Sequence, residues 1–208
     1  MIILGIDPGT ATTGWGIINS QLTANREHPP AGRAGRTAKT KDKKSSLLGA
    51  EGCSLSLVGF GCILTESQDP MGERLLVLKN ALKKIIKTCH PDCVVIEQIF
   101  FGANSTSAIS VGQARGVALL TATEFKLPIF EYTGLAVKLA VADHGRADKK
   151  SIQIAVRKHL CVKKLPKPKD QLGRQVFRFR DDAYDAVAAA ICHVLKTGTG
   201  DRRSGISS

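Results

Sequence analysis

Four carboxylates occupy positions where a negative charge is costly unless a cation meets it. Glu97 lies inside the apolar run 93–100, and Asp7 ends the apolar run 2–6 just before a Pro-Gly turn. Asp182 and Asp185 are three residues apart, so a helix would present both on one face. An unpaired carboxylate in such surroundings loses several kcal/mol of hydration energy. The four residue types and positions therefore predict a common positive partner.

A site for hard divalent cations is the chemistry that this set favours. Oxygen ligands are what Mg²⁺ and Mn²⁺ prefer, and the ions would relieve the repulsion between the acids. Two ions about 4 Å apart would activate a water and stabilise the leaving oxygen of a phosphoryl displacement. Simpler readings stay open for single residues, because Asp181 and Asp182 could favour a helix N-terminus and Asp7 could be a turn residue.

The charge balance points to a polyanionic partner. The chain has 208 residues, with 30 Lys and Arg against 18 Asp and Glu, a net charge of +12. Such an excess favours nucleic acid through phosphate contacts and counterion release, although many basic proteins are basic only for solubility. The charge is thus consistent with a nuclease and does not by itself establish one.

The cysteines and the chain start bear on the compartment. The six cysteines form no CxxC pair and no second ligand pair accompanies Cys89 and Cys93, which argues against zinc and favours reduced thiols. The sequence opens directly on an apolar run without a basic leader, and no apolar stretch reaches the ~18 residues of a membrane span. We therefore expect a cytoplasmic protein.

The elements that must position the four acids follow from hydrophobic periodicity. Extended patterns indicate strands at 2–6, 14–19, 54–64, 93–100 and 128–132. Helical spacing indicates helices at 71–88, 104–125, 134–142, 148–160 and 181–196. This order predicts an α/β fold with a mixed five-stranded sheet and helices on both faces.

Three segments fall outside this regular pattern. Residues 21–53 hold seven Lys and Arg against three acids and no apolar periodicity, which predicts a disordered basic insertion in a hairpin. Residues 162–180 form a long basic loop interrupted by prolines, and 197–208 a flexible tail. We expect 1–196 to be a single domain.

The motifs that carry the acids, taken in order, resemble the RuvC family of Holliday junction resolvases, the crossover junction endodeoxyribonucleases. The segments that resemble the family motifs are 5–10 with 13–16, 96–100, 112–117 and 182–188. The resemblance implies a ribonuclease-H-like fold. It also implies that Asp7, Glu97, Asp182 and Asp185 are the ligands of two Mg²⁺ ions, with Asp7 shared between them.

Substrate contacts and partners are further implications of the resemblance. It implies a homodimer that nicks a four-way DNA junction symmetrically, in recombination and repair, with the branch-migration proteins RuvA and RuvB as partners. Phe100 falls where the family presents an aromatic side chain to the junction centre, and Lys138 and Lys149 are similar to lysines that contact phosphate. Each has a plainer reading, Phe100 as a core residue and the lysines as solvated surface.

Three rival functions remain for comparison. A sugar kinase or actin-like ATPase shares the first motif, but it has two related domains and the chain is too short. A nuclease of the same fold that processes ribosomal RNA would share the metal chemistry without the 113–116 stretch. A non-catalytic junction- or RNA-binding protein would use the basic surface and gain nothing from four acids facing phosphate.

Overall fold

The computed structural model describes residues 1–21, 54–98, 105–176 and 180–198. Phe100, almost all of the predicted insertion 21–53 and most of the predicted tail 197–208 lie outside these ranges.

A five-stranded mixed sheet is the centre of the molecule, with the strand order β3-β2-β1-β4-β5. Strand β2 pairs antiparallel with both β1 and β3, whereas β4 pairs parallel with β1 and β5. Because β1, β4 and β5 point the same way, their carboxyl ends share one edge of the sheet. The strands are β1 Ile2–Asp7, β2 Thr12–Ser20, β3 Leu55–Leu64, β4 Cys93–Gln98 and β5 Ile129–Thr133.

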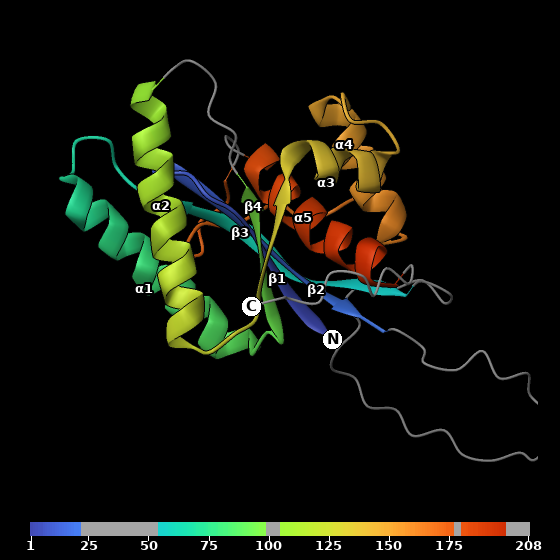
Figure 1. The fold of residues 1–208 in the computed structure, drawn as a ribbon, viewed down its shortest axis with the longest axis horizontal. Coiled ribbons are helices and arrows are strands. Elements are labelled where there is room, and N and C mark those ends of the chain that lie inside the picture. Colours follow the sequence, from blue (N-terminus) through green and yellow to red (C-terminus); the bar gives the residue numbers. More distant parts are fainter. Residues whose placement is uncertain (22–53, 99–104, 177–179, 199–208) are drawn as a thin grey trace, which may run out of the picture.

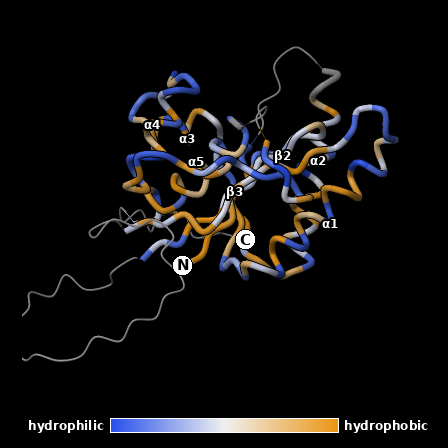
Figure 2. The backbone as a smooth tube through the Cα atoms, turned by 180° about the vertical axis from the view of Figure 1, so that it is seen from behind, coloured by the Kyte–Doolittle hydropathy of each residue, from blue (hydrophilic) through white to orange (hydrophobic). Residues whose placement is uncertain are grey.

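Helices cover both faces of the sheet, as Figure 1 shows, with α1 and α2 on one face and α3, α4 and α5 on the other. Two hydrophobic cores result, one under each layer of helices. Hydrophobic stretches of the chain concentrate in the strands between these layers (Figure 2). The helices are α1 Met71–Cys89, α2 Ser105–Glu124, α3 Gly134–Ala142, α4 Lys149–His159 and α5 Arg180–Gly198.

The predicted fold class is confirmed, and each predicted strand and helix is present within one or two residues wherever the structure describes it. One expectation about thiols is wrong: Cys161 is disulfide-bonded, whereas the other described cysteines are not in disulfides. Sequence spacing failed there because it does not show which cysteines meet in the fold. None of the described helices combines the length and apolarity needed to cross a membrane.

Candidate active site

Two parallel strands bring Asp7 and Glu97 together. Ile6 of β1 lies opposite Ile96 of β4 in the parallel register, so the next residues along, Asp7 and Glu97, follow side by side at the carboxyl ends of the strands. Neighbouring strands are about 4.8 Å apart, which is close for two negative charges. The turn after Asp7 is fixed because the Thr13 hydroxyl donates to the carbonyl of Gly9 at 2.6 Å.

Helix α5 brings Asp182 and Asp185 to the same place by lying almost directly on the backbone of β1 and β2. A Cβ added to Gly14, the β2 partner of Asp7, would lie 2.0 Å from the carbonyl oxygen of Asp182. A Cβ on Gly5 would lie 2.0 Å from that of Ala186. Only glycine permits such close approach of a helix to a sheet. The glycines of these strands therefore set the height of the acidic turn above Asp7.

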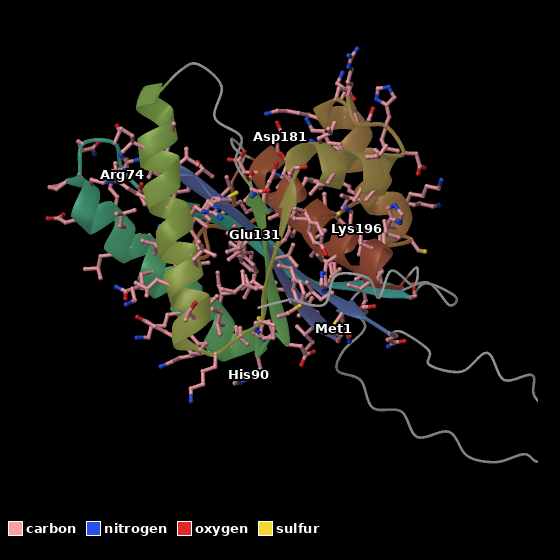
Figure 3. The ribbon with its side chains drawn as sticks, viewed as in Figure 1. Met1, Arg74, His90, Glu131, Asp181 and Lys196 are labelled. Carbon is pink, nitrogen blue, oxygen red and sulfur yellow. The ribbon has the colours of Figure 1, made fainter. Side chains whose placement is uncertain are left out.

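The small residues of α5 make the same contact possible from the helix side. The residues that contact the strand glycines are fully buried and mostly alanine, namely Ala183, Ala186, Val187 and Ala190. Figure 3 labels Asp181 and Lys196 at opposite ends of α5, with Asp181 at the end of the molecule away from Met1 and His90. The carboxylates thus gather at one end of the sheet.

The electrostatics of the four acids show that they act on one another. Burial raises the pKa of Asp7 well above its usual value, and the charges of Glu97, Asp185 and Asp182 raise it further. Burial, followed by the charge of Asp185, raises the pKa of Glu97 to about 7. Without a cation the cluster would therefore hold protons near neutral pH.

The α5 pair shows the same pattern. Burial and then the charge of Asp182 raise the pKa of Asp185 to about 6, and burial raises that of Asp182. Lys149 opposes these shifts at Asp7, Asp182 and Asp185, while Lys138 opposes them at Glu97 and Asp185. Both predicted lysines consequently lie near enough to the acids to act on them.

A cavity of about 700 Å³ opens beside Asp7 and Glu97 and gives the cluster access to a ligand. Lys138 of α3 and Val111 of α2 contribute to its wall. Gly134 begins α3 directly against Glu97, since a Cβ there would lie 2.5 Å from the Glu97 Oε1. The remaining residues that line the cavity are Pro8, Gln98, Thr133 and Leu135.

Lys149 is held toward the acidic helix by Asp181, which is not among the predicted site residues. Lys149 Nζ lies 3.2 Å from Asp181 Oδ2, and Gln153 Nε2 donates to Asp181 Oδ1 at 2.8 Å. Lys149 and Gln153 are one turn apart on α4, so both reach Asp181 from the same side. Asp181 had a signal in the sequence, its place beside Asp182, but the α4 contact is long-range and was not visible there.

The carboxylates do not converge to coordination distance. Within residues 1–21, 54–98, 105–176 and 180–198, no group of three or more His, Cys, Asp or Glu side chains is arranged to hold one metal ion. The donor set itself, four partly buried carboxylates, fits a hard divalent cation.

The sheet order and the two helical layers define the class: the fold is ribonuclease-H-like. Comparison with known proteins narrows this class. A family model described as crossover junction endodeoxyribonuclease RuvC matches residues 43–193. The chain belongs to this RuvC family of nucleases, whose metal dependence supports a divalent metal at the site.

Individual relatives agree over nearly the whole chain. The crossover junction endodeoxyribonuclease RuvC of Desulfitobacterium hafniense is 40% identical over 205 residues, covering 99% of each chain. That of Chloroflexus aggregans is 39% identical over 202 residues, covering 97% of this chain and 98% of the relative. Among solved structures, Thermus thermophilus RuvC in complex with Holliday junction substrate superposes with a TM-score of 0.69 at 26% identity, covering 96% of each chain.

Proposed function

We propose that this protein is a Mg²⁺-dependent endonuclease that resolves Holliday junctions in recombination and repair. The observation that carries the proposal is the gathering of Asp7, Glu97, Asp182 and Asp185 from β1, β4 and α5 at one end of the sheet, where the other three acids all raise the pKa of Asp7. Relatives that carry the junction nuclease name cover nearly the whole chain, and T. thermophilus RuvC has been solved with a Holliday junction.

The proposed role of the four acids is to bind metal ions. The four carboxylates would hold two Mg²⁺ ions, or Mn²⁺ as a substitute, with Asp7 shared because it interacts with all three of the others. The bound ions would supply an activated water and stabilisation of the leaving oxygen. The family resemblance implies that the cuts leave 5′-phosphate and 3′-hydroxyl ends. The carboxylates bind in their ionised form, so ion binding displaces the protons that their raised pKa values retain.

The lysines have the complementary role toward DNA. Lys138 lines the cavity beside Asp7 and Glu97, where an ammonium can meet a phosphate oxygen next to the reacting one. Lys149 pairs with Asp181 and is largely exposed, so it can exchange this partner for a phosphate. We further propose that Phe100, which lies outside the described residues, stacks on bases at the opened junction.

A homodimer is part of the proposal because a two-fold junction needs two symmetric cuts. Support comes from the outer side of the α1 and α2 layer, where Leu76, Val77, Ile109 and Leu120 are exposed. On α2, a Cβ on Gly112 or Gly116 would meet nothing within 4 Å, so a second helix can approach closely. A second copy of the chain is the occupant that we propose for this surface.

The cellular setting completes the proposal. Branch migration by RuvA and RuvB would deliver the junction, and the cytoplasm would be the compartment. Residues 1–196 would form a single nuclease domain, while the assignments of 21–53 as an insertion and of 197–208 as a tail stay predictions.

The test is cleavage of a synthetic four-way junction beside a linear duplex of the same sequence, with Mg²⁺ or with EDTA. We expect paired symmetric nicks in the junction that EDTA abolishes. Cutting of structured ribosomal RNA in preference to the junction would favour the ribosomal RNA nuclease. Junction binding without cutting, in either Mg²⁺ or Mn²⁺, would favour the non-catalytic binding protein.

A further inference from the structure

A second cavity, of about 770 Å³, lies at the β3 edge of the sheet and does not include any of the four acids. Trp15 of β2 and Lys84 of α1 line it together with β3 and the loop that precedes α5. Alternation along β2 places Trp15 on the face covered by α1, whereas Gly14 and Gly16 face α5. The cavity therefore lies at the β3 edge, with Trp15 and Lys84 on the sheet face opposite α5. Its volume is in the range of small-molecule sites, ~300–1,000 Å³.

The loop wall of this cavity is firmly attached to β3. Cys62 donates its backbone N–H to the carbonyl of Lys169 at 3.0 Å. The Gln171 side chain pairs with both backbone groups of Leu64, accepting from the nitrogen at 2.9 Å and donating to the oxygen at 2.6 Å. These contacts add a short segment of the loop to the edge of the sheet, so this part of the cavity wall is held in place.

An aromatic wall is the second feature of the cavity. Strand β3 has glycine at positions 59 and 61 next to Trp15, and Cβ atoms there would lie 3.5 and 3.0 Å from the indole ring. The glycines thus leave room for the ring to lie over β3, where it is only partly buried. Trp15 also lines a smaller adjoining cavity of about 200 Å³ beneath α1. An indole with accessible surface offers a stacking partner for any planar base.

The rim of the cavity is positively charged. Lys84, Lys167 and Lys169 line it and are exposed. Asp170, the one acid among its lining residues, turns its carboxylate into the loop, where it accepts from Arg174 Nε at 2.6 Å and from the backbone of Leu172 and Arg174. The cavity consequently presents ammonium groups around an apolar, aromatic floor.

We propose that this cavity is a second DNA-binding site, which takes a nucleotide of a single strand with its base against Trp15 and its flanking phosphates on Lys84, Lys167 and Lys169. Stacking and cationic contacts to the backbone are the two elements of single-strand binding without sequence preference, and both are present here. The inference rests on the proposed function only in taking DNA as the ligand. The carboxylate site meets phosphate through cations, whereas this one meets it directly.

Trp15 is the only tryptophan in the sequence, so the tryptophan fluorescence of the protein reports directly on this cavity. The full-length protein would be titrated with oligothymidylate in EDTA while Trp15 fluorescence is followed. Stacking of a base on the indole would quench the emission in a saturable way. Added salt would weaken the binding, since each phosphate contact contributes about −0.7 to the slope of log K against log salt for single strands.

Variants assign the binding to the cavity. The triple variant Lys84→Ala, Lys167→Ala, Lys169→Ala should raise the concentration for half-quenching at least about tenfold and flatten the salt slope by about 2. Lys87→Ala, on the same helix but outside the cavity lining, is the matched control and should leave both unchanged. Trp15→Phe, read by anisotropy of a labelled oligonucleotide, should bind nearly as well as the wild type, and Trp15→Ala about fivefold or more weakly.

Three outcomes would overturn the inference. One is anisotropy that reports binding while Trp15 emission stays constant. Another is quenching that the lysine variants leave intact. The third is quenching by thymidine monophosphate as efficient as that by the oligomer at equal nucleotide concentration, which would indicate a free nucleotide as ligand. Junction cleavage by the same preparations is scored separately, so loss of cleavage with intact quenching would contradict the proposed function and leave this site standing.

Discussion

The two cavities are similar in size, about 700 and 770 Å³, and opposite in character. One is lined by Asp7 and Glu97 at the carboxyl ends of β1 and β4, and the other by three lysines around Trp15 at the β3 edge. Acids repel phosphate, so the first needs cations before DNA can enter it. The second needs none.

Burial explains why the two chemistries are separated. The carboxylates have their pKa values raised by desolvation, so they have a strong thermodynamic reason to bind a cation. The lysines of the other cavity are exposed. Desolvated carboxylates thus suit the binding of catalytic cations, whereas exposed lysines suit reversible contact with a DNA strand.

Removal of one carboxylate should give the largest difference between junction cleavage, which depends on the carboxylate cavity, and oligothymidylate binding, which depends on the lysine cavity. Asp7→Asn removes the proposed shared metal ligand. Junction cleavage should fall about a thousandfold, because poorly held ions would stabilise the transition state by several kcal/mol less. Quenching of Trp15 by oligothymidylate should be unchanged. Glu66→Gln, an exposed acid outside the site, is the control and should cut normally. Full cleavage by Asp7→Asn would contradict the assignment.

Displacing the acidic helix should have the next largest effect. Gly14→Ala puts a Cβ 2.0 Å from the carbonyl oxygen of Asp182 and forces α5 away from β2. We expect a loss of about 1–3 kcal/mol in the free energy of unfolding by urea, and about a hundredfold slower cleavage from misplaced ligands. Gly72→Ala in α1, where a Cβ would meet nothing within 4 Å, is the control. Equal effects of the two changes would show that the Gly14 contact is not critical.

Acid pH should weaken the carboxylate cavity selectively. The pKa of Glu97 is about 7, so below that pH a proton competes with Mg²⁺, and the Mg²⁺ concentration for half-maximal cleavage should rise by about tenfold per pH unit. Oligothymidylate binding at the lysine cavity should hardly change between pH 8 and 6, because lysines stay charged there. A Mg²⁺ requirement independent of pH would argue against Glu97 as a ligand.

The raised pKa of Glu97 also predicts how the stability of the folded protein depends on pH. The folded-state pKa of Glu97 lies above its usual value of 4.5, so the folded protein binds more protons between about pH 4.5 and 7. In EDTA the contribution of Glu97 to stability is therefore present at low pH and lost as pH rises through that window. Urea unfolding at pH 5 and 8 should show the loss in the wild type and less of it in Glu97→Gln.

Lys149→Ala should have the smallest effect of the series, about three- to tenfold slower cleavage. Lys149 is exposed and pairs with Asp181, so its contact with phosphate is partly screened by water. Lys150→Ala, the exposed neighbour, is the matched control and should be neutral. Cleavage by Lys149→Ala at the wild-type rate would reduce this lysine to a structural partner of Asp181.

Periodicity predicted the strands and helices because each pattern is local: the apolar run around Glu97 and the spacing of Asp182 and Asp185 are visible without the fold. The contacts that assemble the site are not local. Gly14 against Asp182 and Lys149 against Asp181 join segments far apart in sequence, and the cavity at Trp15 needs a loop folded back on β3. Such juxtapositions depend on tertiary packing, which no sequence window contains.

The most direct test of the central claim is a crystal structure grown with Mn²⁺ and measured at an anomalous wavelength. We predict anomalous peaks about 2.1 Å from carboxylate oxygens of Asp7, with Glu97 and the α5 acids rotated toward them. A structure in which Mn²⁺ binds elsewhere, while Asp7, Glu97, Asp182 and Asp185 remain apart and metal-free, would contradict it.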